Sequence, residues 1–193
     1  MNKDILIKNK DNILDIKFNR PESRNAITRE MFESLLKVLE KCKEDHELRA
    51  IFLSGEGDAF SAGGDVKDMA SKEDTSSLEE KTNSLRRIMG VSELLYTLPI
   101  PTISVINGAA AGAGFAISLA CDMRIATENA KFVTAFSKIA FSGDFGGSYF
   151  LTKIIGSAKA RELFYLSEAI DGKKANDLGI VNSLVNSTEI DDY

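Results

Sequence analysis

One acidic residue in the C-terminal half of the chain stands where it could move a proton. Asp144 lies in the segment Ser142-Gly-Asp-Phe-Gly-Gly-Ser148, directly after the apolar run Ile139-Ala-Phe141. Aspartate is favoured in tight turns and at helix caps, so a structural role is one interpretation. The other is a carboxylate held partly away from water, where it can act as a general acid or base. The residue types alone leave both interpretations open.

Two glycine-bearing segments could bring main-chain N–H groups to a ligand. Ala62-Gly-Gly-Asp65 and Gly108-Ala-Ala-Ala-Gly-Ala-Gly114 each follow a predicted buried strand and precede a predicted helix. Glycine lets the backbone approach a ligand closely, and the start of a helix offers free N–H donors. The alternative for each segment is a tight turn that packs a helix on a strand. The second contains neither GxGxxG nor GKS/GKT, which counts against dinucleotide and P-loop sites.

The residue types that other chemistries need are scarce. His46 is the only histidine, and it stands in a charged run that predicts an exposed helix end. One histidine without clustered cysteines nearly excludes a Ser-His-Asp hydrolase or a histidine-rich metal site, so we predict no metal. Cys42 and Cys121 lack CxxC spacing, and we expect two reduced structural thiols in a reducing, cytoplasmic compartment.

The composition is that of a soluble globular protein. The 193 residues are 44% hydrophobic and 27% charged, and we find no internal repeat or linker, so we expect a single domain over residues 1–193. The formal net charge of -5 predicts no general attraction to nucleic acid or to an anionic membrane. The N-terminal residues lack a signal-peptide core, and no apolar run reaches membrane-spanning length.

Apolar periodicity predicts alternating strands and helices that would position these residues. Phe32, Leu35, Leu36 and Leu39 recur at helical spacing after Thr28, which can cap the helix. The predicted strands span 13–18, 50–53, 102–106, 123–126, 131–133 and 180–185. Further helices are predicted at 85–95, 115–121, 158–166 and 173–178, loops or turns at 60–66 and 108–114, and a mobile surface segment at 70–80. This alternation predicts an α/β fold with a parallel or mixed sheet packed against helices.

The order and separation of several short motifs resemble the crotonase (enoyl-CoA hydratase/isomerase) superfamily, from about Ile13 to Val185. The matching segments are Asn19-Arg-Pro21 with Asn25-Ala-Ile27, Phe60-Ser-Ala-Gly-Gly-Asp-Val-Lys-Asp-Met69, Pro101-Thr-Ile103 to Asn107-Gly108, Gly112-Ala-Gly114, Cys121-Asp122, Ala130-Lys-Phe132 and Ala175-Asn-Asp-Leu-Gly-Ile-Val181. The resemblance implies a crotonase-like fold of repeated ββα units. It also implies an acyl-CoA thioester substrate, no cofactor beyond the CoA that the substrate carries, and assembly into a homotrimer or hexamer.

The resemblance also implies binding roles for particular residues. The main-chain N–H groups of Gly64 and Ala113 would form an oxyanion hole for the thioester oxygen as it gains enolate charge. The predicted CoA-binding residues are Arg24, Ala26, Ala62, Asp65 and Val66. Arg24 could meet a CoA phosphate, although an exposed loop arginine is an equal alternative.

The chain departs from the family's hydratases at two positions. Those enzymes carry two glutamates that activate water and protonate carbon, and the matching positions here are Ala116 and Phe136. The segments 135–139 and 143–147 instead resemble members that shift double bonds, notably the ring-epoxyphenylacetyl-CoA isomerases, in which the aspartate matching Asp144 is the single acid/base. We therefore expect an acyl-CoA double-bond isomerase with Asp144 as its proton carrier.

Three alternatives stay open at this point. Enoyl-CoA hydration would have to proceed without the two glutamates. Aryl-CoA dehalogenation would use an aspartate nucleophile at position 144. The family's dehalogenases also require Trp and His near the site, and this chain has no Trp and only His46. Non-catalytic acyl-CoA binding is the third, because family members usually continue with further helices where this sequence stops. We expect those C-terminal helices to be missing, which would weaken the trimer and the closure of the acyl pocket.

Overall fold

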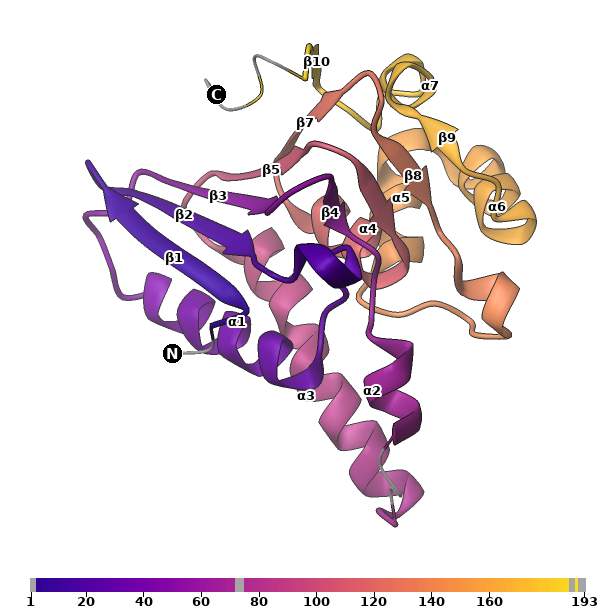
Figure 1. Cartoon of the computed structure of the whole chain (residues 1–193), viewed down its shortest axis with the longest axis horizontal. Helices are drawn as coiled ribbons and strands as arrows, with labels where there is room; N and C mark the ends of the chain where they lie inside the picture. The colour runs from indigo at the N-terminus through magenta and orange to yellow at the C-terminus, as the bar shows by residue number, and fades with distance from the viewer. Residues whose placement is uncertain (1–2, 72–74, 188–189, 191–193) are drawn as a thin grey trace.

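The computed structural model describes residues 3–71, 75–187 and 190, which form a mixed α/β fold with two sheets (Figure 1). In spatial order, the larger sheet consists of β1 (Ile5–Lys10), β2 (Ile13–Phe18), β3 (Ala50–Gly55), β5 (Thr102–Ile106), β7 (Met123–Thr127) and β10 (Ser183–Val185). The smaller sheet consists of β4 (Ala59–Ser61), β6 (Ala109–Ala111), β8 (Lys131–Val133) and β9 (Ile170–Asp171). Neighbouring strands run parallel except in the pairs β1–β2 and β8–β9.

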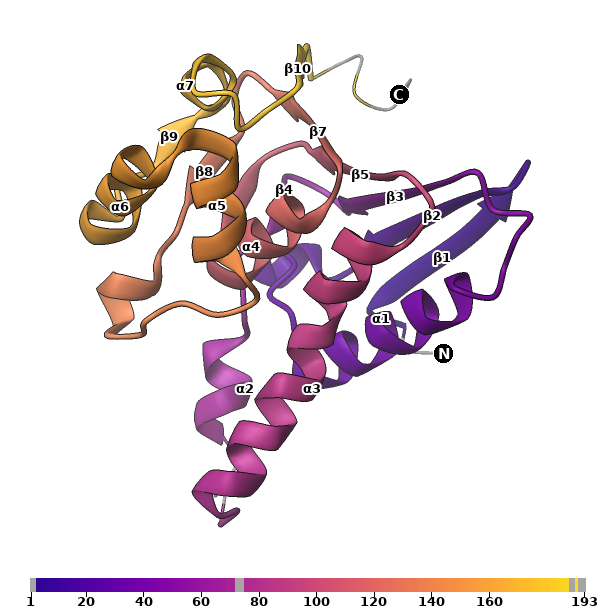
Figure 2. The same ribbon diagram turned by 180° about the vertical axis from the view of Figure 1, so that it is seen from behind.

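Helices cover the larger sheet on one side and fill the space beside the smaller sheet. In chain order they are α1 (Arg29–Cys42), α2 (Val66–Ser71), α3 (Leu78–Thr97), α4 (Gly112–Ala120), α5 (Gly147–Ile155), α6 (Ser157–Leu166) and α7 (Gly172–Asp177). Helices α1 and α3 pack together against the larger sheet, and α4 lies at the centre between α3 and α5 (Figures 1 and 2). Helix α2 and the first turns of α3 project beyond both sheets in the two views.

The chain repeats one arrangement: a strand of the larger sheet, then a strand of the smaller sheet, then a helix. The units are β3-β4-α2 with α3, β5-β6-α4, and β7-β8-α5. This is the ββα repetition that the resemblance implied. Because β4 and β6 are neighbours in the smaller sheet, the segments that follow them begin side by side.

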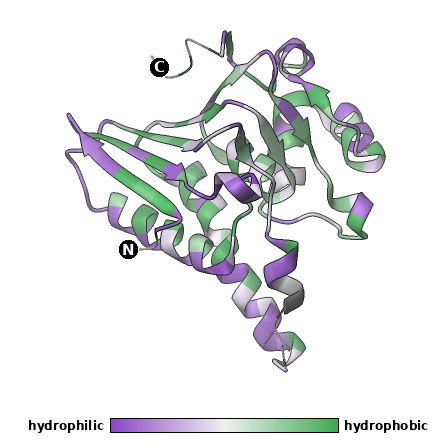
Figure 3. Ribbon diagram, viewed as in Figure 1, coloured by the Kyte–Doolittle hydropathy of each residue, from purple (hydrophilic) through white to green (hydrophobic). Residues whose placement is uncertain are grey.

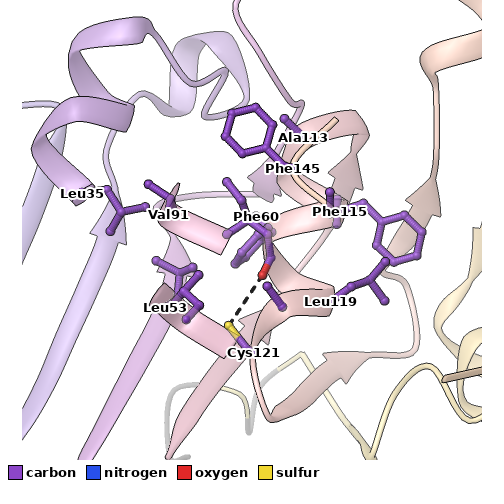
Figure 4. Close-up of a cluster of buried hydrophobic side chains, with 14 of the residues drawn as sticks. Leu35, Leu53, Phe60, Val91, Ala113, Phe115, Leu119, Cys121 and Phe145 are labelled. Carbon is purple, nitrogen blue, oxygen red and sulfur yellow. Dashed lines mark hydrogen bonds between the residues drawn. The ribbon is translucent and has the colours of Figure 1, made fainter. Parts of the chain in front are cut away.

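The strands bury alternate side chains and the helices bury one face, and these burial patterns explain why the sequence forms strands and helices at these positions. In β2, Leu14, Ile16 and Phe18 are buried, whereas Ile13 is exposed. In Figure 3 hydrophobic (green) and hydrophilic (purple) residues share α1, as expected of a helix with one face on a sheet. All nine residues of α4 are buried, and most of the side chains around this helix are apolar. Figure 4 shows part of this core, with the thiol of Cys121 donating to the carbonyl oxygen of Ile117 at 3.7 Å.

Most of the predicted elements are confirmed. Helix α1 begins after Thr28, whose hydroxyl accepts a hydrogen bond from the N–H of Met31. Strands β2, β5 and β8 have the predicted bounds. Cys42 and Cys121 are both buried and unbridged, as expected for structural thiols.

Three predictions were wrong. The expected loop at 60–66 begins as strand β4, and the expected turn at 108–114 is strand β6 followed by the start of α4. Three-residue strands are too short to show alternation, so periodicity cannot find them. Within the expected mobile segment, 70–71 belong to α2 and 78–80 to α3, while 72–74 lie outside the described residues. A capping box between Ser77 and Glu80 starts α3 in spite of its polar sequence.

Candidate functional site

The ends of β4 and β6 bring the two glycine-bearing segments together. The strands pair in parallel, with Ala59 opposite Ala109, so the chain leaves both at the same edge of the smaller sheet. The two segments approach each other most clearly at Gly63, where there is no room for a side chain. A Cβ atom there would lie 2.8 Å from the carbonyl oxygen of Ala111 and 3.4 Å from the nitrogen of Ala113. With φ at +96° as well, position 63 needs glycine for both space and conformation.

The backbone leaves the N–H groups of Gly64 and Ala113 available to a ligand. The N–H of Ile27 donates to the oxygen of Gly63 at 2.8 Å, and the N–H of Asp65 donates to the oxygen of Ile27 at 3.0 Å. In this parallel bridge the residue between the two bonded groups, Gly64, directs its own N–H to the opposite side. Ala113 is the second residue of α4, where an N–H has no acceptor within the helix.

Gly64, Ala113 and Asp144 line a single cavity of about 220 Å³. Its walls come from α1, α3 and the segment between β8 and α5, and they are almost entirely apolar. The larger side chains in these walls include Phe32, Leu85, Ile88, Phe136, Phe141 and Phe145. Among the described residues that line the cavity, Asp144 carries the only ionisable side chain. The structure thus brings together the three residues that the sequence singled out for catalysis.

Local backbone geometry holds Asp144 at the cavity and away from the helix that follows. Phe145 and Gly146 have left-handed φ values of +49° and +73°. Gly146, and not Asp144, occupies the N-cap position of α5, and no side chain caps that helix. Phe145 is buried and stacks on Phe32 with ring centroids 4.5 Å apart, which anchors the turn. The helix-cap interpretation of Asp144 is therefore excluded.

The carboxyl of Asp144 is partly buried and poorly hydrogen-bonded. Among the described residues, its buried Oδ1 has no hydrogen-bond partner. Burial among apolar side chains raises the pKa of this carboxyl from 3.8 to about 6, and its own main-chain N–H opposes the shift to a smaller extent. An unsatisfied buried polar atom costs about 1–3 kcal/mol. Such an atom in a cavity, on a group whose pKa lies near neutrality, marks a candidate proton carrier.

The raised pKa of Asp144 predicts an effect on stability. The native state holds this proton more tightly than the unfolded state, so stability falls as the pH rises from 3.8 to about 6. Asp144→Asn lacks this ionisation. We therefore expect it to unfold like the wild type below pH 3.8 but to be more stable near neutral pH. Because the cavity is open to water, we expect a gain of about 1–2 kcal/mol in the free energy of unfolding, measured by urea denaturation.

Asp65→Asn supplies a control of opposite sign. The ion pair with Arg20 holds the pKa of Asp65 below its usual range, so the ionised carboxylate stabilises the native state. Its asparagine variant should lose stability near neutral pH. Equal effects of the two substitutions would contradict this assignment of the Asp144 pKa.

The predicted CoA-binding residues divide into two groups. Ala62 and Val66 line the cavity beside Gly64. Arg24, Ala26 and Asp65 do not line it, and they remain predicted contacts for parts of CoA outside it. Arg24 is exposed and has a left-handed φ of +52°.

Arg20 is the residue that organises this loop, and the sequence reading overlooked it. Its Nη1 donates to the carbonyl oxygen of Ala26 at 2.6 Å and pairs with Asp65 at 2.8 Å. Asp65 in turn accepts from the N–H groups of Lys67 and Asp68, both at 3.1 Å, at the start of α2. The sequence signal for this residue is its place in the family motif Asn19-Arg-Pro21, which does not by itself reveal the contacts with Ala26 and Asp65.

The two positions that carry glutamate in the family's hydratases hold apolar side chains in this fold. Ala116 is buried in α4, and its methyl carbon lies 3.1 Å from where a Cβ on Gly147 would stand. Phe136 is buried, lines the cavity and stacks on Phe164 with ring centroids 6.5 Å apart. A phenyl ring therefore occupies a wall where a second carboxylate would have stood.

Some lining residues could not have been recognised from sequence. Phe32, Leu85 and Ile88 show only the helical spacing of core residues, and nothing in that spacing tells a core from a pocket wall. Across residues 3–71, 75–187 and 190, no helix is both long and apolar enough to cross a membrane. The same residues contain no group of three or more His, Cys, Asp or Glu placed to hold a metal ion.

Comparisons with known proteins agree with this geometry. A family profile described as enoyl-CoA hydratase/isomerase matches residues 8–193. A Bacillus subtilis (strain 168) protein called "Probable enoyl-CoA hydratase" is 38% identical over 161 residues, which are 82% of this chain and 60% of that protein. The chain spans about three fifths of the length of the curated relatives it matches.

Solved structures extend the likeness over nearly the whole chain. An enoyl-CoA hydratase from Bacillus anthracis matches with a TM-score of 0.90 and 30% identity, over 98% of this chain and 73% of that one. A Thermobifida fusca YX protein, crystallised in complex with acetoacetyl-CoA, matches with a TM-score of 0.91 and 25% identity, over 98% of this chain and 76% of that one. With its sequence and its fold both matching, the chain belongs to the enoyl-CoA hydratase/isomerase family.

Proposed function

We propose that this chain shifts the double bond of an enoyl-CoA thioester, with Asp144 as the single acid/base and the N–H groups of Gly64 and Ala113 as the oxyanion hole. One observation carries the proposal. A carboxyl with a pKa of about 6, whose Oδ1 has no hydrogen-bond partner among the described residues, is the one ionisable group that they contribute to an apolar cavity that two main-chain donor positions also line. Within the family, this arrangement is nearest in type to the ring-epoxyphenylacetyl-CoA isomerases.

The proposed reaction needs one proton and no other reagent. The ionised Asp144 takes a proton from C2 of a 3-enoyl thioester, and the electrons of that C–H bond form a dienolate. The thioester oxygen carries the new negative charge and accepts hydrogen bonds from Gly64 and Ala113. Asp144 then returns the proton to C4, which leaves the double bond between C2 and C3. Phe136 and the other apolar residues of the cavity wall supply no second carboxylate that could activate water for addition to the product.

The ligand class in this proposal rests on the relatives. The Thermobifida fusca protein was crystallised with acetoacetyl-CoA, and its fold matches this chain along nearly its full length. We propose that a thioester binds this chain with its carbonyl at the start of α4, between the N–H groups of Gly64 and Ala113. We also propose that the chain assembles into a homotrimer or hexamer and is cytoplasmic. Light scattering on the purified chain measures its oligomeric state.

Ultraviolet absorbance separates isomerisation from the alternatives. A 3-enoyl-CoA becomes a conjugated 2-enoyl-CoA on isomerisation, so the absorbance of the conjugated thioester should rise when the chain is added. Given a 2-enoyl-CoA, a hydratase would instead remove that absorbance, as the names of several relatives would suggest. Release of chloride from an aryl-CoA would favour dehalogenation. Binding of CoA thioesters without any turnover would favour a non-catalytic binder.

The pH dependence of the isomerase reaction should report Asp144 directly. The base must be ionised to take the first proton, and its pKa is about 6. We expect kcat/KM to be constant above that pH and to fall about tenfold per pH unit well below it. Stopped-flow absorbance over this range, with circular dichroism as a check that the protein stays folded, measures the profile. A rate that stays flat across the window would count against Asp144 as the base.

A further inference from the structure

The side chain of Arg124 is buried at the end of α4 that lies opposite Ala113. Arg124 is the second residue of β7 and is only 5% exposed. Its Nη1 donates to the carbonyl oxygen of Cys121 at 2.7 Å and to that of Ser118 at 3.4 Å. These carbonyls belong to the last turn of α4 and to its C-cap. The guanidinium therefore caps the helix whose first turn carries the proposed oxyanion donor.

The remaining donors of Arg124 also meet neutral acceptors. Its Nε donates to the oxygen of Ile180 at 2.6 Å, and its Nη2 lies 3.4 Å from Oδ1 of Asn182 and 3.5 Å from the main-chain oxygen of Asp122. The carboxylate of Asp122 is bonded instead to the N–H and hydroxyl of Thr102, both at 2.8 Å. In the part of the chain that the structure describes, no ion pair forms on this guanidinium. A buried positive charge thus stands at this helix end without a salt bridge, although the neighbouring Asp122 carboxylate acts on it electrostatically.

This placement has an electrostatic consequence along α4. The carbonyl end of a helix carries a partial negative charge, and a cation beside it is stabilising. All nine residues of α4 are buried, so water screens this interaction weakly. At a rise of about 1.5 Å per residue, the two ends of the helix lie roughly 13 Å apart. The charge of Arg124 therefore adds to the positive potential at the N-terminal end and also fixes where that end points.

We infer that Arg124 is a positioning residue for the oxyanion site, acting through α4 on the N–H of Ala113. The inference rests on the oxyanion hole of the proposed function, whichever reaction follows thioester binding. Arg124 touches no cavity residue that could react, so it acts only by holding the helix and by its charge. The bonds to Ile180 and Asn182 show that it also ties the C-terminal part of the chain to β7, and the test must separate the two roles.

Three variants make that separation. Arg124→Met removes the charge but has a side chain of similar length. Arg124→Lys keeps the charge but lacks the planar guanidinium and its several N–H donors. Asn182→Ala is the matched control, because it breaks the contacts of Asn182 with the Arg124 main chain and Nη2 but leaves the guanidinium on α4. For each we would measure thermal unfolding, kcat and KM with 3-hexenoyl-CoA. We would also record the infrared stretch of a ¹³C-labelled carbonyl in bound hexanoyl-CoA, which cannot isomerise.

A positioning role predicts a defined pattern. In Arg124→Met, kcat should fall about five- to tenfold with little change in KM, and the bound carbonyl stretch should move back toward its frequency in solution. Arg124→Lys should recover part of both. Asn182→Ala should unfold at a lower temperature while keeping kcat and the carbonyl frequency of the wild type.

Two results would overturn this inference while leaving the proposed oxyanion hole intact. One is Arg124→Met with wild-type kcat and carbonyl frequency and only a lower unfolding temperature. The other is Asn182→Ala changing kcat and frequency as much as Arg124→Met does. If Arg124→Met does not fold, Arg124→Gln takes its place, because it also lacks the charge, and a wild-type kcat and carbonyl frequency in that variant would refute the positioning. A wild-type protein whose bound hexanoyl-CoA shows the solution frequency would overturn the oxyanion hole and this inference together.

Discussion

Asp144→Asn is expected to lower kcat for conversion of a 3-enoyl-CoA by about 10³-fold or more, the range measured when a general acid/base is removed. The amide has nearly the size of the carboxyl but cannot take a proton. Among the described residues that line the cavity, no other side chain can ionise to replace it. Stopped-flow ultraviolet absorbance at saturating substrate gives the rate.

The loss should be confined to the chemical step. Binding of a saturated acyl-CoA, measured by calorimetry, should stay within a few-fold of the wild type because the thioester contacts are main-chain groups. Asp144→Glu is the matched variant, since it keeps a carboxyl but displaces it by one methylene, and it should retain more activity than the asparagine variant. An asparagine variant that turns over at the wild-type rate would show that the proton carrier lies elsewhere.

Ala113→Pro is expected to lower kcat by about 10²–10³-fold or more, because it removes one oxyanion donor and sets a ring carbon where that N–H pointed. Proline lacks the N–H, and at the second residue of α4 that N–H has no partner within the helix. The fixed φ of proline suits the first turn of a helix. The preceding residue is Gly112, which has a left-handed φ of +49° and no Cβ to meet the proline ring, so only its backbone N–H approaches that ring.

Two controls keep this second result interpretable. Ala113→Gly retains the N–H and should keep most of the activity, so a comparable loss there would point to packing and not to the donor. Far-ultraviolet circular dichroism and thermal unfolding should show Ala113→Pro folded. A folded proline variant with undiminished kcat would remove Ala113 from the oxyanion hole.

How much could be predicted from sequence depended on the length of each element. The spacing of Phe32, Leu35 and Leu39 and the cap at Thr28 predict helix α1. The structure confirms that these three side chains are buried and that Thr28 caps the helix. The strands β4 and β6 hold three residues each, and β6 is Ala-Ala-Ala, so neither shows a period. The sequence pattern therefore predicts a loop and a turn here, although these two strands set the distance between the two proposed donors.

The environment of Asp144 depends on contacts distant in sequence. The local residue pattern favours a turn or cap residue, and only the family resemblance favours a proton carrier. The stack of Phe145 on Phe32 and the burial of Oδ1 give the carboxyl its raised pKa, and no local pattern encodes either one. The family motifs placed Gly64, Ala113 and Asp144 on one site in advance. They carried no information on the walls that α3 supplies through Leu85 and Ile88.

The pairing of β4 with β6 also bears on how the protein reaches its native state. Ala59 and Ala109 meet across the smaller sheet although fifty residues separate them along the chain. Contacts between such distant segments close large loops, and they form late compared with helices and hairpins. A refolding chain should therefore regain its far-ultraviolet helical signal before it regains the ability to bind a thioester. Catalytic competence is then the last property to appear.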